Sequence, residues 1–212
     1  ACGVISLTTD FGFHDSYVGT MKAVILRIFP EARLIDITHQ ISAQDVLEAS
    51  LIIDSGYRYF PAGSVHLVVV DPGVGGERRP LVVAGREHYF VGPDNGSFTA
   101  MLDADSEAKV FEIREERFLL PGTRATFHGR DIYGPVAAHL SAGMKASVVG
   151  PEIWDPVRLP VTSPAMTGQG IQGSVVNIDN FGNLMTNIPG QLLDQAGLKQ
   201  GNVLIVTVGN RS

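Results

Sequence analysis

The sequence has few of the features that mark extracellular, membrane-spanning or nucleic-acid-binding proteins. Its 212 residues include a single cysteine, Cys2, which excludes an internal disulfide and a cysteine-based zinc site. No apolar stretch reaches the roughly 18 residues that a membrane-spanning helix needs. The net charge is −6, and the 16 lysines and arginines are scattered rather than clustered. We therefore expect a cytoplasmic protein that has no nucleic-acid or membrane partner.

Several widespread catalytic and nucleotide-binding motifs are absent as well. The chain contains no G-x-x-x-x-G-K-[ST], no H-E-x-x-H and no G-x-S-x-G, so nothing indicates a phosphate-loop ATPase, a zincin or an α/β-hydrolase. Residues 168–173 do match G-x-G-x-x-G. A dinucleotide-binding loop, however, needs a strand before it and a helix after it, whereas a proline-bearing segment and a β-branched run flank this match. We interpret it as the beginning of a second domain.

What the sequence does contain is a regular alternation of strand and helix patterns over about 150 residues. Strand patterns occur at 4–9, 34–37, 65–70, 81–84 and 88–91. Helical patterns occur at 15–29, from a capping box at Ser42–Asp45 to about residue 59, and at 132–141. This alternation predicts an α/β fold, with a mostly parallel sheet covered by helices on both faces.

The composition changes near residue 157. Residues 158–167 contain two prolines and little periodicity, which indicates a linker between an N-terminal domain (1–157) and a C-terminal domain (168–212). Strand patterns at 171–178 and 203–208 predict that the second domain is mainly antiparallel β. A β domain of about 45 residues is marginal alone, so we expect it to be incomplete here or completed by packing against another surface.

The strongest functional signal is the end of the apolar run Val65–Val70. Such a run is typical of a strand buried on both faces of a parallel sheet, and here it ends in Asp71 and a loop rich in glycine and proline. Ligands bind outside the carboxyl ends of strands in open α/β sheets, so Asp71 lies where chemistry is expected. Arg78 can fold back across the loop to meet it, and His128 is a candidate third member of a polar trio that handles water.

Further candidates follow other predicted strands. Asp10 comes after the first strand, where a carboxylate can accept hydrogen bonds from a ribose diol. Asp15 is either a second ligand or a charge favoured by the N-terminal end of a helix. The segment Asp179-Asn-Phe-Gly-Asn183 has ordinary turn chemistry, but an exposed Phe181 could stack on a base while Asn183 reads its edge. Gly92-Pro-Asp-Asn-Gly96 is a turn by composition, and Arg130 and Asp131 form a candidate ion pair at a helix start.

Taken together and in order, five segments resemble the S-adenosylmethionine (SAM) hydroxide adenosyltransferases, the adenosine-forming SAM hydrolases related to fluorinase and chlorinase. The resemblance covers nearly the whole chain. The five segments are Thr9-Asp-Phe-Gly12, Asp71-Pro-Gly-Val-Gly75 with Arg78, Gly92-Pro-Asp-Asn-Gly96, Phe127-His-Gly-Arg-Asp131 and Asp179-Asn-Phe-Gly-Asn183.

The resemblance implies an architecture, a reaction and a catalytic group. The architecture is an N-terminal α/β domain and a C-terminal β-barrel-like domain, in a homotrimer with active sites between subunits. The reaction is hydrolysis of SAM to adenosine and L-methionine, with no cofactor and no metal. Asp71, Arg78 and His128 would hold and activate the attacking water. Which of them takes the proton stays open.

The resemblance also implies a set of substrate-binding residues. Asp10 would bind the ribose hydroxyls, and Asp15 and Asp179 the methionine ammonium group. Phe181 would stack on adenine, and Asn183 would hydrogen-bond its edge. The family continues past a point like Ser212, so we expect further contacts with the methionine carboxylate and adenine to lie outside this sequence.

Three alternatives differ from this reading. A halogenase is disfavoured, because halogenating relatives hold halide in a largely apolar pocket and a carboxylate at Asp71 would repel it. A non-catalytic SAM- or adenosine-binding module is consistent with the short C-terminal domain. A metal-dependent hydrolase that uses Asp10, Asp71 and His128 has the least support.

Overall fold

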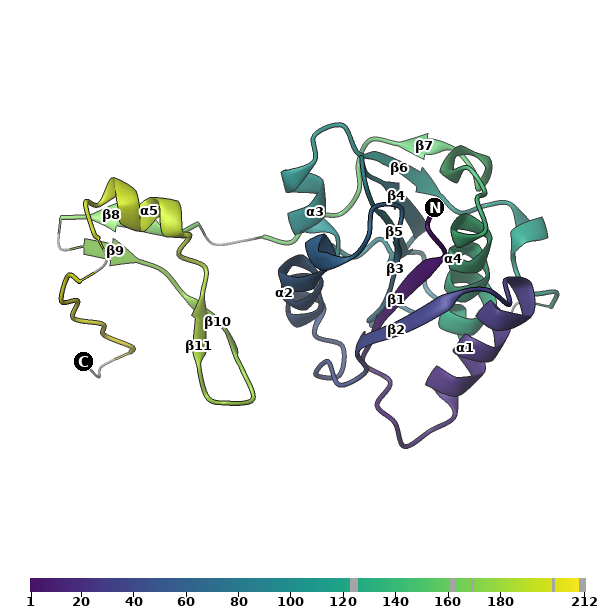
Figure 1. Ribbon diagram of the computed structural model, residues 1–212, viewed down its shortest axis with the longest axis horizontal. Helices are drawn as coiled ribbons and strands as arrows, with labels where there is room; N and C mark the ends of the chain where they lie inside the picture. Colours follow the sequence, from purple (N-terminus) through teal and green to yellow (C-terminus); the bar gives the residue numbers. More distant parts are fainter. Residues whose placement is uncertain (123–125, 161–162, 169, 200, 210–212) are drawn as a thin grey trace. The chain divides into compact units, whose positions relative to one another are not determined.

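The computed structural model describes residues 1–122, 126–160, 163–168, 170–199 and 201–209. The chain divides into two compact units, Ala1–Leu159 and Pro160–Ser212, and each is described by itself (Figure 1). Within the described residues, no helix has the length and hydropathy that crossing a bilayer requires.

A seven-stranded sheet forms the centre of the first unit. The strand order is β2–β1–β3–β5–β4–β6–β7, and β2, β1, β3 and β5 run parallel. The pairs β5–β4, β4–β6 and β6–β7 are antiparallel. The strands are β1 (Val4–Thr9), β2 (Arg33–Thr38), β3 (Val65–Val69), β4 (Pro80–Ala84), β5 (Tyr89–Pro93), β6 (Lys109–Glu112) and β7 (Glu152–Ile153). The predicted mostly parallel α/β sheet is confirmed.

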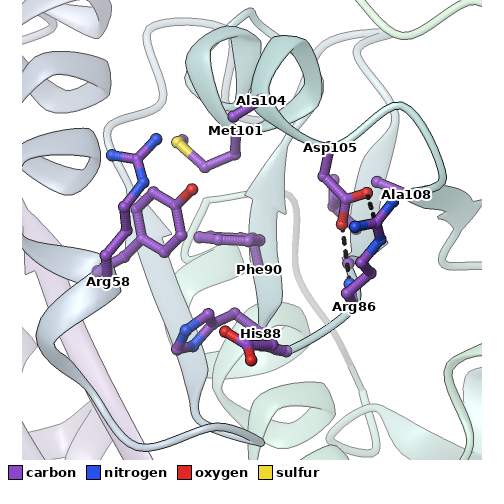
Figure 2. Close-up of a pocket in the computed structure, with 12 residues that line it drawn as sticks. Arg58, Arg86, His88, Phe90, Met101, Ala104, Asp105 and Ala108 are labelled. Carbon is purple, nitrogen blue, oxygen red and sulfur yellow. Dashed lines mark hydrogen bonds and ion pairs between the residues drawn. The ribbon is translucent and has the colours of Figure 1, made fainter.

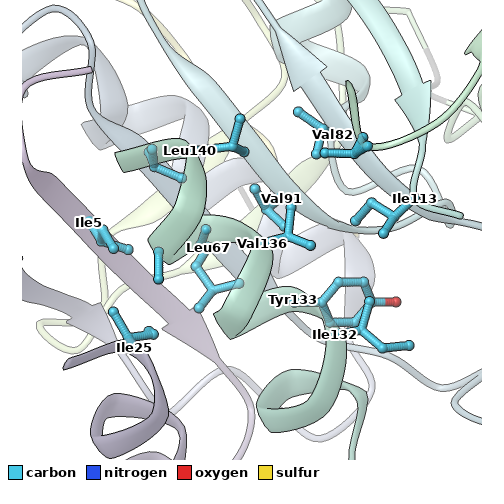
Figure 3. Close-up of a cluster of buried hydrophobic side chains, with 14 of the residues drawn as sticks. Ile5, Ile25, Leu67, Val82, Val91, Ile113, Ile132, Tyr133, Val136 and Leu140 are labelled. Carbon is cyan, nitrogen blue, oxygen red and sulfur yellow. The ribbon is translucent and has the colours of Figure 1, made fainter. Parts of the chain in front are cut away.

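Helices cover both faces of this sheet, as the sequence predicted. Helices α1 (Tyr17–Ile28) and α4 (Gly134–Ser141) lie on one face, and α2 (Val46–Gly56) and α3 (Thr99–Ala104) on the other (Figure 1). Successive side chains of β3 point to opposite faces of the sheet. Leu67 lies in the core under α1 and α4, and Val68 lies in the core under α2 and α3. Figure 3 shows the first of these cores, where side chains of α1 and α4 gather against the strands. Short helical turns are η1 (Tyr57–Tyr59), η2 (Glu116–Phe118), η3 (Gly129–Tyr133, a π-helical turn) and η4 (Ala146–Val148).

Helix α2 begins later than the sequence pattern indicated. The predicted capping box at Ser42–Asp45 is wrong in register, because Asp45 is itself the N-cap and its carboxylate accepts a hydrogen bond from the Glu48 backbone N–H at 2.8 Å. Glu48 in turn accepts from the backbone N–H of Ser42 at 2.8 Å. Asp45 therefore caps the helix alone, and Glu48 reaches back past the N-cap to Ser42 instead of completing a capping box with Asp45.

The second unit consists of two small antiparallel sheets and one short helix. Its elements are β8 (Ala165–Thr167) paired with β9 (Gly170–Gln172), β10 (Val175–Ile178) paired with β11 (Leu184–Thr186), and α5 (Gly190–Gln195). Strand β8 lies inside the range 158–167 that the composition indicates as a linker. The described residues of this unit form no closed barrel, and none of them is buried.

Two strand predictions in the second unit need correction. The apolar run 171–178 is divided between β9 and β10, and the run at 203–208 forms no continuous strand, with a single bridge residue at Val208. β-Branched residues favour extended backbone, but a strand also needs a hydrogen-bonding neighbour. Val203 and Ile205 are almost fully exposed, so the run at 203–208 is apolar without being covered.

Candidate active site

The loop after β3 brings Asp71 and Arg78 together. Turn-forming backbone hydrogen bonds run from Val74 N to Asp71 O (3.2 Å) and from Gly76 N to Gly73 O (2.9 Å), so the loop reverses within a few residues. The Arg78 Nε donates to Asp71 Oδ1 at 2.8 Å, and its Nη2 donates to Asp71 Oδ2. This bidentate pair is shielded from water, since the two side chains are only 6% (Asp71) and 11% (Arg78) exposed.

His128 joins the pair through Arg78. The Arg78 Nη2 donates to His128 Nδ1 at 2.6 Å. Because a guanidinium can only donate, Nδ1 must be the acceptor, and the neutral imidazole then carries its proton on Nε2. Burial and the neighbouring Arg78 charge lower the pKa of His128. The trio expected from the sequence is therefore brought together, with a neutral histidine of defined tautomer.

Tyr133 is a fourth polar group at this cluster that the sequence analysis missed. Its side chain is fully buried, and its hydroxyl donates to Asp71 Oδ2 at 3.4 Å. Burial and the Asp71 carboxylate raise the pKa of Tyr133 well above its usual value, so the hydroxyl stays protonated and remains a donor. In a helical pattern rich in apolar residues a tyrosine indicates core packing, and no local signal distinguishes this one.

Asp10 lies in a loop that is tied to the segment after β2. Its Oδ2 accepts from the backbone N–H of Gln44 at 2.9 Å, and Gln44 has a left-handed φ of 67°. A neighbouring buried bond joins Thr9 Oγ1 to His39 Nδ1 at 2.8 Å, and the Nε2 of His39 lies 3.0 Å from an Asp36 carboxylate oxygen. These contacts hold the Asp10 loop, but no recorded hydrogen bond links Asp10 to the Asp71 cluster in the part of the chain that the structure describes.

Asp15 is a surface residue in this structure. Its side chain is 60% exposed, and its nearest recorded ionic partner is His14 at 3.7 Å. It lines a hollow of about 610 Å³ beside the start of α1, together with Phe13 and Lys22. Within the described residues, no hydrogen bond or ion pair connects it to Asp71, Arg78 or His128.

The residues predicted in the second unit form a tight turn between β10 and β11. Asp179 Oδ1 accepts from the backbone N–H groups of Phe181 (2.9 Å) and Asn183 (2.8 Å), and its Oδ2 accepts from the Asn183 side chain at 2.6 Å. Hydrogen bonds from Asn183 and Phe181 lower the pKa of Asp179. The turn leaves the Phe181 ring 90% exposed, as stacking on a flat ligand requires.

A second hollow lies elsewhere in the first unit. It measures about 620 Å³ and is lined by side chains that include His88, Phe90 and Met101 (Figure 2). It lies at the edge of the sheet where β5 begins, opposite the edge that carries Asp71. Arg86, which lines it, pairs with the lining residue Asp105 at 3.9 Å and with Glu107 at 3.0 Å. No group of three or more His, Cys, Asp or Glu side chains in the described residues could hold a metal ion. The polar cluster, rather than the hollow, is therefore the candidate active site.

The fold and the cluster define an α/β protein that presents a paired carboxylate and a neutral histidine at the carboxyl edge of its sheet. Comparison with protein families narrows this class. The SAM hydroxide adenosyltransferase N-terminal domain matches residues 5–150, and the C-terminal domain of the same family matches residues 173–211. The chain belongs to the SAM hydroxide adenosyltransferase family.

Individual relatives agree with this assignment. The chain is 39% identical to the (R)-S-adenosyl-L-methionine hydrolase of Salinispora tropica, over 90% of this chain and 74% of that protein. The hydrolase of the same name from Methanocaldococcus jannaschii is 34% identical over 99% of this chain and 74% of its own. A fluorinase from Actinoplanes is 27% identical over 92% of this chain and 74% of that protein. Among solved structures, an uncharacterized conserved protein from Thermotoga maritima superposes with a TM-score of 0.93 at 38% identity, covering 97% of this chain and 79% of that one.

Proposed function

We propose that this protein hydrolyses S-adenosyl-L-methionine to adenosine and L-methionine. The observation that carries the proposal is the buried Asp71–Arg78–His128 cluster at the carboxyl end of β3. Relatives at 34–39% identity that bear the name of this hydrolase support the substrate and the reaction.

In this reaction the protein must activate the nucleophile, not the leaving group. The sulfonium of SAM makes methionine a good leaving group, whereas water is a weak nucleophile with a pKa of about 15.7. In the proposed step the water oxygen forms a bond to ribose C5′, and the C5′–S bond breaks with its electron pair going to sulfur. One water proton goes to a protein group and then to solvent. Holding the water in line with the C5′–S bond provides the larger part of the acceleration.

The hydrogen-bond pattern favours Asp71 as the proton acceptor. The Nδ1 lone pair of His128 is already occupied by Arg78, and its Nε2 carries a proton, so neutral His128 can donate but cannot accept. Among the described residues, Arg78 is the one donor to Asp71 Oδ1. The second lone pair of this oxygen therefore remains available to accept a hydrogen bond from water. We assign proton acceptance to Asp71 and orientation of the water to Arg78 and His128.

The remaining parts of the proposal concern the substrate contacts and the assembly. Asp10 binds the ribose hydroxyls, Asp15 and Asp179 bind the methionine ammonium, Phe181 stacks on adenine and Asn183 bonds its edge. The protein works in the cytoplasm without a cofactor, as a homotrimer whose active sites lie between subunits. The exposed apolar side chains of the second unit, with no buried residue among its described ones, support association with another surface.

Product analysis tests the reaction directly. Incubation with SAM, followed by chromatography, is expected to give equimolar adenosine and methionine. Saturating chloride or fluoride should add no halogenated adenosine, because the carboxylate of Asp71 repels a halide. Calorimetric SAM binding without any adenosine above the buffer control would instead favour a binding module. Static light scattering should report about three times the 22.7 kDa of one chain.

A further inference from the structure

The turn after β5 lies beside the end of β3. The two strands are parallel neighbours, with Leu67 paired with Val91, so the chain leaves both strands at the same edge of the sheet (Figure 1). Gly92 makes this close approach sterically feasible, because a Cβ there would lie 2.3 Å from the carbonyl oxygen of Val68. The sequence predicted a turn at 92–96 and left a functional role for it open, but Gly92 and Pro93 still belong to β5, so the turn begins at Asp94.

Asn95 in this turn holds the first end of the loop 71–79. Its side-chain Nδ2 donates to the carbonyl oxygen of Val70 at 2.8 Å, at the peptide that joins Val70 to Asp71. Its Oδ1 accepts from the backbone N–H (3.2 Å) and the hydroxyl (2.6 Å) of Ser97, which fixes the amide orientation. The backbone of the proposed proton acceptor is thus tied to the neighbouring strand.

Asp94 holds the other end of the same loop. Its Oδ2 accepts from Arg79 Nε at 2.8 Å, and its backbone N–H donates to the carbonyl oxygen of Arg79 at 2.8 Å. Its Oδ1 accepts from the backbone N–H of Val157 at 2.7 Å, and Arg79 also donates to Asp155. The Asp94 side chain is only 4% exposed, so these bonds are shielded from water. Arg79 directly follows Arg78, the residue that contacts both Asp71 and His128.

The loop itself has little that could fix its ends. Residues 72–77 are all exposed, and three of them are glycines. Among the described residues, the loop forms two internal backbone hydrogen bonds, and both lie in its turns. A glycine-rich exposed segment samples many conformations, so the spacing of Asp71 and Arg78 depends on what holds residues 70 and 79.

We propose that Asp94 and Asn95 are positioning residues, which hold the two ends of the loop 71–79 and thereby set the geometry of the Asp71–Arg78 pair. They touch neither substrate nor water in this scheme and act through Asp71 and Arg78. The proposal rests on the proposed hydrolysis for its kinetic consequence, but its geometric consequence stands independently.

Single-atom exchanges test the two contacts separately. Asn95→Asp keeps the acceptor for Ser97 but has no hydrogen to donate to Val70 O. Asp94→Asn keeps one oxygen but loses the charge that faces Arg79. The matched control is Asp103→Asn, which loses the ion pair of an exposed α3 carboxylate with Arg158 and has no recorded bond to the loop. Each variant is assayed well below its own melting temperature, so that global stability does not enter the rate.

Two readouts are measured on the full chain: kcat and KM for SAM, and the NMR signal of the Arg78 Nε–H with its rate of solvent exchange. We expect kcat to fall about 10- to 100-fold in Asn95→Asp and Asp94→Asn, since a misplacement of about 1 Å can cost 10²-fold. KM should stay within threefold, Asp103→Asn should match the wild type, and the Arg78 signal should shift and exchange faster in the two test variants. If Asn95→Asp does not fold, Ser97→Ala is measured instead. This variant removes the hydroxyl that donates to Asn95 Oδ1, so it should show a smaller fall in kcat and a smaller shift of the Arg78 signal.

The results separate this proposal from the proposed function. Folded test variants with kcat within twofold of the Asp103→Asn control, or with an unchanged Arg78 signal, would overturn the positioning role. A wild-type protein that releases no adenosine refutes the hydrolysis, and the Arg78 signal then still decides whether Asp94 and Asn95 hold the loop.

Discussion

Replacing Asp71 by asparagine keeps the size of the side chain but removes its ability to take a proton. Arg78 would retain an oxygen acceptor, so the buried guanidinium would keep part of its pairing. We expect kcat for SAM hydrolysis to fall about 10²- to 10⁴-fold, the usual contribution of a general base. Calorimetry should show SAM binding retained. A variant that keeps more than a tenth of the wild-type kcat would contradict proton acceptance by Asp71.

The pH dependence of the reaction should reflect His128. Burial and Arg78 lower its pKa from the ordinary value of 6.5, so the neutral form persists to a lower pH than for a free histidine. A second proton would occupy Nδ1 and break the hydrogen bond from Arg78. We therefore expect kcat/KM to be flat above about pH 6.5 and to fall only at lower pH.

A His128→Asn variant is the control for that profile. Its activity should be lower overall, and the acid limb with the midpoint seen in the wild type should disappear. A wild-type midpoint above pH 6.5, or the same acid limb in His128→Asn, would contradict the assignment. Both profiles are measured as initial rates of adenosine release.

Sequence reasoning reached some residues of the cluster and not others, for physical reasons. Asp71 and Arg78 are joined by a loop of glycine and proline that reverses the chain, so their meeting follows from local sequence. His128 lies 50 residues from Arg78, so no local sequence feature joins the two; its residue type made it a candidate, and the family resemblance strengthened that candidate. Tyr133 was missed because a tyrosine in an apolar helical pattern indicates core packing. Asp94 and Asn95 were singled out only as part of a turn, because an Asp-Asn turn has an ordinary structural explanation and no residue role followed from it.

At the scale of elements, the buried strands were predictable and the short ones were not. The run at Val65–Val69, apolar except for His66, is a central strand because both of its faces are covered. Strands β8 and β11 have three residues each, too few for an alternation to stand out. The pattern at 81–84 predicts strand β4 but not its antiparallel direction, because direction depends on the connection between strands and not on a strand's own residues.

A buried polar chain links three elements through the sheet and should make stability pH-dependent. His66 in β3 bonds Ser6 of β1 at 2.7 Å through Nδ1 and His88, just before β5, at 3.2 Å through Nε2. Burial, with a smaller contribution from His88, lowers the pKa of His66 to about 3. Below pH 6.5 the unfolded chain therefore binds a proton that the folded chain does not, and the free energy of unfolding decreases as the pH falls from about 6.5 toward 3.

One such proton corresponds to a slope of about 1.4 kcal/mol per pH unit. Urea denaturation between pH 7 and pH 4 should show this slope in the wild type, steepened by His88, whose pKa burial also lowers. His66→Asn should be less stable at pH 7 but lose stability less steeply on acidification. Equal slopes for the two proteins would show that His66 is not the group that responds.

On the scale of the whole molecule, the two units differ in what holds them together. The two hydrophobic cores lie entirely within residues 1–159. The described residues of the second unit include no buried side chain, while Phe181, Val203 and Ile205 are nearly fully exposed. The sequence predicted that a β domain of this size would be marginal, but the position of its strands could not be predicted, since pairing in so small a unit is not specified by a buried face.

Dividing the chain between residues 159 and 160 tests this difference. The fragment 1–159 retains both cores and the Asp94–Val157 bond, so it should unfold cooperatively with urea and give a dispersed NMR spectrum. The fragment 160–212 should show neither property, because too little apolar surface is buried to offset the conformational entropy of ordering it. Without Asp179, Phe181 and Asn183, the fragment 1–159 should release no adenosine from SAM. A cooperative transition in 160–212 alone would contradict the view that this unit depends on another surface for its stability.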